Sequence, residues 1–263
     1  MRTTLATPGT RPAPAVPERP RLLSHVARWG RARRWIPADA ALVLDVGAAF
    51  GYGTAALAAR SRHRVIGVER DPAHIAAARA RFPWLELLHG SAESLPFPDA
   101  SVDAVTLLDV LEHVADPAGV LDEAHRVLKP GGVLVVSVPH RGLLEPLDSL
   151  NVYPRIRRPG WPPLDPADDC DAGGHQHFSL RELEDRLGPG FTVDAVARTG
   201  LGLAEVVHLA ALVGVRGILG SERGYRALLL VHLLVYVLDD LLPLGPASYY
   251  LTVRARAVPR SAR

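Results

Sequence analysis

The chain has 263 residues, of which 48% are hydrophobic, so it can bury the core of one large domain or of a domain with an appendage. Its single cysteine, Cys170, excludes an internal disulfide framework and fits a reducing cytosol, so we expect a cytoplasmic protein. The basic residues are all arginines except Lys129. We interpret this preference for arginine as a bias of the genome and not as a sign of function.

Positive charge is concentrated near the N-terminus, where residues 1–34 hold eight arginines and one acid, Glu18. Residues 1–20 also hold five prolines, which predicts a disordered basic tail. No apolar stretch follows the early arginines, so a signal peptide is not expected. Such an arm could contact nucleic acid or anionic lipid, but a solvated tail is the simpler interpretation, and no nucleic-acid partner is expected.

Residues 21–36 have apolar residues at roughly helical spacing, which predicts a helix that packs on the following domain. From Ala41 onward, short apolar runs alternate with helical patterns. Strands are predicted over 41–46, 63–69, 84–90, 102–109 and 131–139, and helices over 53–61, 71–82 and 117–129. This alternation predicts a parallel sheet that is covered by helices on both faces.

The second half of the chain is less regular. Residues 140–178 are rich in Pro, Asp and Gly and are expected to form a variable lid or acceptor loop. Ser179 and Glu182 then form a capping box for a helix. Two more strands are predicted over 191–199 and 248–257, with apolar helices between them over 200–247. One domain is therefore expected over 21–258, followed by a short tail over 259–263.

The stretch "VLDVGAAFGYGT", residues 43–54, places a glycine-rich turn between a strand and a helix. Such a turn offers bare backbone N–H groups at the point of an α/β sheet where ligands bind. The dinucleotide fingerprint fails because Tyr52 replaces its third glycine, which disfavours a nicotinamide cofactor. Glu69 ends the second strand and can accept both hydroxyls of a ribose, so the pattern favours an adenosine ligand.

Three further stretches accompany this turn: "GVERD", "GSAESLPFPDASVDAVTLLDVLEHVADP" and "EAHRVLKPGGVLVVSVP". Together with the turn, they make the chain resemble the class I S-adenosylmethionine-dependent methyltransferases, especially small-molecule enzymes of the quinone-biosynthesis type. The resemblance is close over residues 40–140. It implies an α/β fold with a Rossmann-like, seven-stranded, mostly parallel sheet, in which residues 200–247 would be a helical insertion before the last strand. It also implies S-adenosyl-L-methionine as cofactor and methyl transfer as activity.

The resemblance further implies which residues contact the cofactor. One loop would line the methionine part of the cofactor with Asp45, Gly47, Ala49 and Gly51, and Glu69 would hold the ribose. The adenine would lie beside Arg70, Ser91 and Ala92. The methionine amino group would be approached by Asp109 and Val110. Two positions depart from the family pattern, since Ala49 is usually glycine and Ser91 is often aspartate. Ala49 adds only a methyl group, which is costly only where φ is positive.

Methyl transfer is an in-line displacement, and a hydroxyl acceptor needs a general base. Four histidines are considered as possible general bases: His113, His140, His175 and His177. His140 follows the fifth predicted strand and His113 lies in "LEHV", and these two are the candidate bases. For any single histidine, hydrogen bonding or a surface position is the simpler interpretation. Oxygen is the expected methyl acceptor.

The loop sequence "DPADDCDAGGHQHF" contains residue types that ligate metals. Carboxylates in loops are usually solvated, however, and two histidines at i and i+2 define no metal geometry. No metal is therefore expected.

Residues 227–238 carry no charge but are too few to cross a bilayer. They are expected to pack in the core or in a homodimer, or else to dip into the inner face of a membrane as a peripheral hairpin that collects a lipid-linked acceptor. The acceptor is thus a small molecule or a lipid-linked one. The alternative function is a non-catalytic methyltransferase-like module that binds cofactor or a partner at a membrane. One narrow stripe on these helices is polar: Tyr225, His232, Tyr236 and Asp240.

Overall fold

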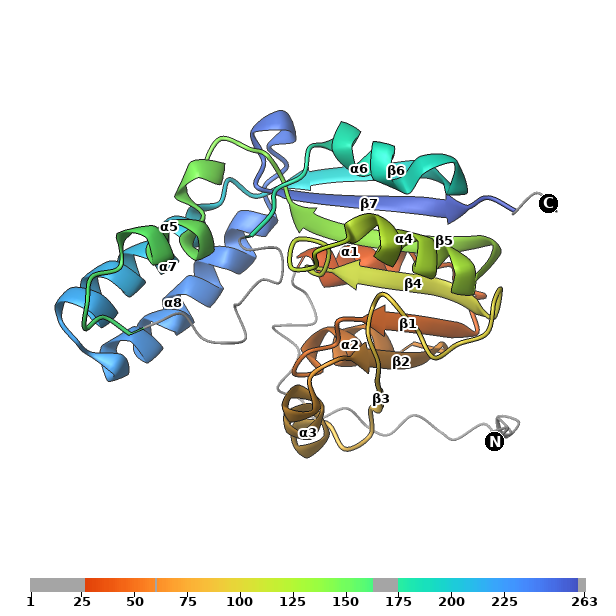
Figure 1. Ribbon diagram of the computed structural model, residues 1–263, viewed down its shortest axis with the longest axis horizontal. Coiled ribbons are helices and arrows are strands. Elements are labelled where there is room, and N and C mark those ends of the chain that lie inside the picture. The colour runs from red at the N-terminus through yellow and green to blue at the C-terminus, as the bar shows by residue number, and fades with distance from the viewer. Residues whose placement is uncertain (1–26, 60, 163–174, 260–263) are drawn as a thin grey trace.

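The computed structural model describes residues 27–59, 61–162 and 175–259; the predicted tails and Cys170 lie outside these ranges. The strands form one seven-stranded sheet in the order β3-β2-β1-β4-β5-β7-β6 (Figure 1). Adjacent strands are parallel except that β7 runs antiparallel to both β5 and β6. The predicted mostly parallel sheet is confirmed. Its strands are β1 Leu42–Val46, β2 Arg64–Glu69, β3 Glu86–His89, β4 Val102–Leu108, β5 Leu128–Pro139, β6 Phe191–Thr199 and β7 Tyr250–Ala257.

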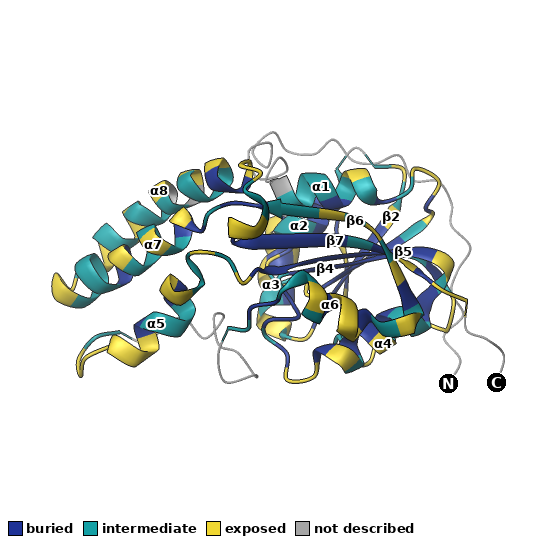
Figure 2. Ribbon diagram, turned by 90° about the horizontal axis from the view of Figure 1, so that it is seen from above, coloured by how far each residue is buried: buried dark blue, intermediate teal, exposed yellow. Residues whose placement is uncertain are grey.

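Helices cover both faces of the sheet, because its central strands are apolar on both sides (Figure 2). On one face lie α1 Ala27–Trp35 and α2 Tyr52–Ala58, and on the other α4 Pro117–Val127 and α6 Leu180–Leu187. A further helix, α3 Pro72–Arg81, packs beside β2 and β3. The sheet therefore has a core on each face.

Local sequence sets where these helices begin. Asp71 and Asp116 accept backbone N–H groups at the starts of α3 and α4, each directly before a proline. The predicted capping box of Ser179 and Glu182 is present at the start of α6. The helix predicted over residues 21–36 is seen as α1, whose Ala32 is buried against the sheet and α2 together with Ile36, the residue after the helix.

A group of helices extends beyond the carboxyl edge of the parallel strands (Figure 1). It comprises α5 Ser149–Ile156, α7 Leu203–Ala210, the π-helical segment Ala211–Ile218 and α8 Glu222–Asp240. The last three lie between β6 and β7, where apolar helices were predicted. The helix α5 falls in the predicted irregular loop over 140–178, and Asp148 caps it by accepting from the N–H groups of Leu150 and Asn151.

Two consecutive acids at the end of α8 attach these helices to the sheet. Asp239 accepts the N–H groups of Leu201, Gly202 and Leu203 at the start of α7. Asp240 accepts from the Thr199 hydroxyl at 2.7 Å and from the backbone N–H of Arg28 at 3.0 Å. The insertion is thereby held at the end of β6 and against α1.

One side of α8 is apolar and faces solvent. Val231, Leu234, Leu238 and Leu241, which we call the α8 row, are 47–57% exposed and follow one another at spacings of three, four and three residues. This spacing places them on one stripe of the helix. Within the described ranges, no helix is both long enough and apolar enough to cross a membrane.

Candidate functional site

The glycine-rich turn after β1 has three residues in the left-handed region. Gly47, Ala49 and Gly51 have φ values of 79°, 43° and 80°. At Ala49 this conformation costs about 1–2 kcal/mol relative to a right-handed residue. The Ala49 N–H donates to the Glu69 carboxylate at 2.8 Å, which helps to hold the strained turn. The alanine thus adopts the backbone of the glycine it replaces, at an energetic cost.

Gly47 lies against the end of β4. A Cβ atom at Gly47 would lie 2.5 Å from Cγ2 of Val110, so a side chain here would displace Val110. The structure brings together these two residues, which the resemblance assigned to the same end of the cofactor. Whether they contact it stays a prediction.

Asp45 is buried and both of its oxygens are engaged. One oxygen accepts from Thr54 at 2.6 Å and the other from Thr106 at 2.8 Å. Burial raises the pKa of this carboxyl, and the two hydroxyls oppose the shift. Asp45 therefore fixes the end of β1 to α2 and β4, and its predicted contact with methionine stays a prediction.

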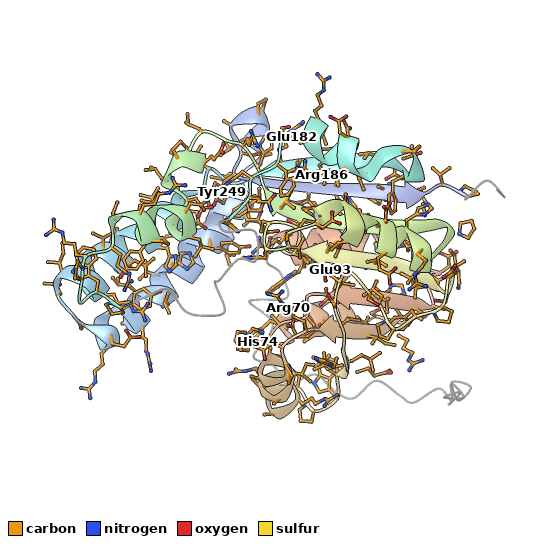
Figure 3. All side chains as sticks on the ribbon, in the orientation of Figure 1. Arg70, His74, Glu93, Glu182, Arg186 and Tyr249 are labelled. Atoms are coloured by element: carbon orange, nitrogen blue, oxygen red, sulfur yellow. The ribbon has the colours of Figure 1, made fainter. Side chains whose placement is uncertain are left out.

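Glu69 joins two loops at the edge of the sheet. Its carboxylate accepts from the Ala49 N–H on one oxygen and from the Asp71 N–H at 2.9 Å on the other. Figure 3 shows Arg70 and His74 together near the start of α3. A ring contact of 4.4 Å between centroids joins His74 to Phe50, which is 42% exposed beside the turn. The sequence did not indicate this aromatic pair.

The predicted adenine-flanking residues Ser91 and Ala92 follow β3. The Ser91 hydroxyl donates to the Glu93 carboxylate at very short range. Glu93 is labelled in Figure 3, on the same edge of the sheet as Arg70. A carboxylate thus adjoins the position where the family often has aspartate, although it comes from two residues further along the chain.

Asp109 follows β4 with a φ of 59° and pairs with an arginine that sequence reasoning missed. Arg28 of α1 donates to Asp109 Oδ1 at 2.6 Å and lies over the rings of Tyr236 and Tyr250, at 4.8 and 5.4 Å from their centroids. Burial raises the pKa of Asp109 to about 7, and Arg28 opposes the rise. Burial alone would lower the pKa of Arg28, but Asp109 and the two tyrosines outweigh it and the pKa rises.

The two predicted bases, His140 and His113, lie after β5 and β4. His140 is buried, and its Nδ1–H donates to the Ser248 carbonyl at 3.0 Å, which leaves Nε2 as the basic nitrogen. Burial lowers the pKa of both His140 and His113. Both imidazoles are therefore neutral near pH 7, the state that a general base needs.

His175 differs from these two. Burial lowers its pKa, but its hydrogen bond to Asp148 and the charges of Asp148 and Glu112 outweigh burial and raise the pKa to about 10. A histidine that keeps its proton at pH 7 cannot accept another. The structure therefore favours His140 and His113 over His175 as bases.

A polar row runs inside the helical insertion. Ser149 hydrogen-bonds Glu205 and His208, and His208 Nε2 lies 2.9 Å from the Tyr225 hydroxyl. The row continues through rings that lie 5.1–6.4 Å apart and reaches β7. Three of its buried polar atoms have no hydrogen-bond partner among the described residues: His232 Nε2, Tyr236 Oη and Tyr250 Oη.

Topology explains why these residues meet. The predicted cofactor residues come from the carboxyl ends of β1, β2, β3 and β4, which share one edge of a parallel sheet. Sequence reasoning missed Arg28, Asp148 and Tyr249, since each reaches the site from an element distant in sequence. The helix predicted over residues 21–36 holds several arginines, and nothing in the sequence distinguishes Arg28 from the others.

Known proteins share this domain. The family profile described as "Methyltransferase domain" matches residues 44–136. A probable S-adenosylmethionine-dependent methyltransferase of Mycolicibacterium smegmatis is 46% identical over 104 residues, which cover 40% of each chain. A demethylmenaquinone methyltransferase of Clavibacter sepedonicus is 40% identical over 97 residues, covering 36% of this chain and 39% of that protein. The chain thus matches about two fifths of the length of these relatives.

Among solved structures, an S-adenosylmethionine-dependent methyltransferase from Mesorhizobium loti aligns with a TM-score of 0.55 over 89% of this chain and 99% of that one, at 20% identity. The sheet order and this alignment show a Rossmann-like fold. Over residues 44–136 the chain resembles the class I S-adenosylmethionine-dependent methyltransferases, including those of quinone biosynthesis. This resemblance implies S-adenosyl-L-methionine as the cofactor.

The residues at the sheet edge suit that cofactor. The turn presents only small residues at positions 47, 49 and 51, and Glu69 places a carboxylate at the end of β2. Asp109 adds a second carboxylate at the end of β4. These groups match a ligand with an adenosine at one end and an amino acid at the other.

Proposed function

We propose that this protein transfers a methyl group from S-adenosylmethionine to a hydroxyl oxygen of a small or lipid-linked acceptor. When bound, the cofactor supplies an electrophilic methyl group on its sulfonium. The chain's own residues would hold the two reactants in line, exclude water and remove the acceptor proton.

The observation that carries this proposal is the set of buried polar atoms beyond the carboxyl edge of the sheet. His232, Tyr236 and Tyr250 each have a buried polar atom without a partner among the described residues. Unpaired buried polar atoms are costly, so a polar ligand in contact with them would recover free energy. Tyr236 and Tyr250 adjoin Arg28, which contacts Asp109 at the expected methionine end of the cofactor. An acceptor bound there would lie beside the methyl group.

A neutral imidazole supports oxygen as the acceptor atom. His140 and His113 have pKa values lowered by burial, so either could accept the proton of an alcohol or a phenol. An amine needs such a base less. The His140 ring is fixed by its hydrogen bond to Ser248, which keeps its other nitrogen available.

The α8 row supports contact either with a lipid surface, from which the acceptor would come, or with a second subunit. Its four exposed side chains are apolar, and apolar surface of this kind is seldom left in water. A helix with one apolar side can lie in the plane of a membrane interface and take its substrate from there. Peripheral contact at the inner membrane face, or a homodimer through residues 200–247, would cover this row.

The test is a transfer assay with methyl-labelled S-adenosylmethionine. The acceptors are quinols and alkyl alcohols, each paired with the amine in which nitrogen replaces the hydroxyl oxygen. We expect label on oxygen and a large loss of kcat in His140→Asn or His113→Asn. Label found only on nitrogen would refute oxygen transfer. Cofactor binding without transfer to any acceptor would support a non-catalytic module at a membrane or on a partner.

A further inference from the structure

Glu112 is a buried carboxylate that forms an ion pair with His175 but accepts no side-chain hydrogen bond within the described residues. Its side chain is 1% exposed, and neither oxygen has a hydrogen-bond partner among the described residues. Burying an ionised carboxylate is expensive unless a cation or hydrogen-bond donors accompany it. Nε2 of His175 lies 3.8 Å from Glu112 Oε1, an ion-pair distance that is too long for a hydrogen bond. A metal ion held between these two atoms would take the place of the proton on His175 Nε2.

Two imidazoles adjoin this carboxylate. One ligand atom each from Glu112, His113 and His175 lie within 4.8 Å of one another, and the two rings are 5.1 Å apart. Around a tetrahedral zinc ion with bonds of about 2.1 Å, neighbouring ligand atoms are about 3.4 Å apart. The gap between Glu112 and His175 exceeds that spacing by a few tenths of an ångström, which a rotation of one side chain can close.

Asp148 orients His175 as metal sites require. Nδ1–H of His175 donates to Asp148 Oδ2 at 2.6 Å, so Nε2 is the nitrogen that faces Glu112. Metal-binding histidines commonly donate their second nitrogen to a carboxylate in this way. Asn151 also holds the His175 backbone through hydrogen bonds of 2.9 and 2.7 Å.

A second grouping shares His175 but is already engaged. Asp148, His175 and His177 also place ligand atoms within 4.8 Å. However, Asp148 Oδ2 accepts from His175 and from the Tyr249 hydroxyl at 2.9 Å, and its other oxygen accepts from Leu150. Figure 3 shows Tyr249 where the sheet meets the helical insertion. Asp148 is therefore better suited to orient a ligand than to be one.

We propose that Glu112, His113 and His175 bind a divalent transition-metal ion such as Zn²⁺, with Asp148 as the residue that orients His175. Two imidazoles and one carboxylate leave a coordination position open, as in catalytic zinc sites. This inference replaces the expectation from sequence that no metal binds. The use of this open position by an acceptor oxygen rests on the proposed function. A His113 that binds zinc cannot also accept a proton, so His140 would then be the base.

The test begins with metal-stripped full-length protein, titrated with Zn²⁺ by calorimetry and with Co²⁺ by visible absorption. We expect one ion per chain and Co²⁺ bands typical of four- or five-coordinate nitrogen and oxygen ligands. Glu112→Gln and His175→Asn should each abolish the Co²⁺ bands. Asp148→Asn should weaken Zn²⁺ binding by about 10–100-fold, the usual effect of losing such an orienting carboxylate.

His125→Asn is the matched control, because His125 lies at the end of α4, away from the site. It should bind Zn²⁺ like the wild type. Glu112→Gln keeps the side-chain shape, so circular dichroism should show it folded without metal. Wild-type protein that takes up no ion, or a folded Glu112→Gln variant that binds Zn²⁺ as tightly as wild type, would overturn the proposal.

The same samples separate this proposal from methyl transfer. Zinc uptake that depends on Glu112, in a protein that transfers no methyl group, would support the metal site and refute only the proposed function. If metal-stripped protein takes up no zinc but binds S-adenosylhomocysteine and transfers methyl groups, the proposed function is supported and only the metal site is refuted.

Discussion

Arg28→Met should destabilise the protein, and more so at high pH. The substitution keeps an unbranched side chain over Tyr236 and Tyr250 but removes the charge that faces Asp109 at 2.6 Å. Because the pKa of Asp109 is raised to about 7 in the folded protein, this carboxyl favours folding at low pH and loses that contribution as pH rises toward 7. Without Arg28 its pKa should rise further, so the loss should continue above pH 7.

The size of this effect follows from the pKa. At pH 6 Asp109 is protonated with or without Arg28, so the loss should be limited to packing and cation–π contacts, about 1–2 kcal/mol. Above pH 7 the variant should lose up to about 1.4 kcal/mol more for each pH unit by which its pKa exceeds that of the wild type.

Urea denaturation of wild type and Arg28→Met at pH 6 and pH 8 measures this difference. Arg31→Met is the control, since Arg31 lies on the same helix but hydrogen-bonds Thr252. Its effect should not depend on pH in this range. An equal loss for Arg28→Met at both pH values would refute the assigned coupling between Arg28 and Asp109.

Three further predictions concern the turn, the cofactor and the exposed row. Ala49→Gly should raise the free energy of unfolding by up to about 1 kcal/mol, because it relieves a positive φ; a lower melting temperature would contradict this. Affinity for S-adenosylhomocysteine should rise roughly tenfold from pH 6 to pH 8 as Asp109 ionises, and calorimetry on Asp109→Asn should show no such rise. Leu234→Glu combined with Leu238→Glu should abolish self-association or vesicle flotation while circular dichroism stays unchanged, because both side chains are 56% exposed; an unfolded variant would contradict the exposed position.

Sequence patterns predicted the sheet well because they are local. The apolar strands, the prolines that begin α3 and α4, and the capping box of Ser179 and Glu182 all act within a few residues. The number of strands came from the family resemblance, and their order came from the structure. Periodicity did not predict α5, since its eight residues include Pro154 and are too few to show a clear pattern.

The site was less predictable because its contacts are long-range. Arg28 and Asp109 are 81 residues apart, and Tyr249 and Asp148 are 101 apart. Nothing in the local sequence indicates that His175 keeps its proton while His140 loses it, because the difference depends on the carboxylates that each meets in the fold. The sequence could suggest histidines as bases, but only the structure distinguishes His175 from His140 and His113 by protonation.

Binding of S-adenosylhomocysteine to wild type and Glu69→Gln, measured by calorimetry at pH 8, tests the central claim most directly. Glu69→Gln keeps the side-chain shape but loses the charge at the expected ribose site, so affinity should fall by about 1.5–3 kcal/mol, or 10- to 150-fold. Glu86→Gln, which removes an exposed carboxylate paired with Arg64 on the neighbouring strand, should bind like wild type. Equal affinity of wild type and Glu69→Gln, or no binding by wild type, would contradict the account.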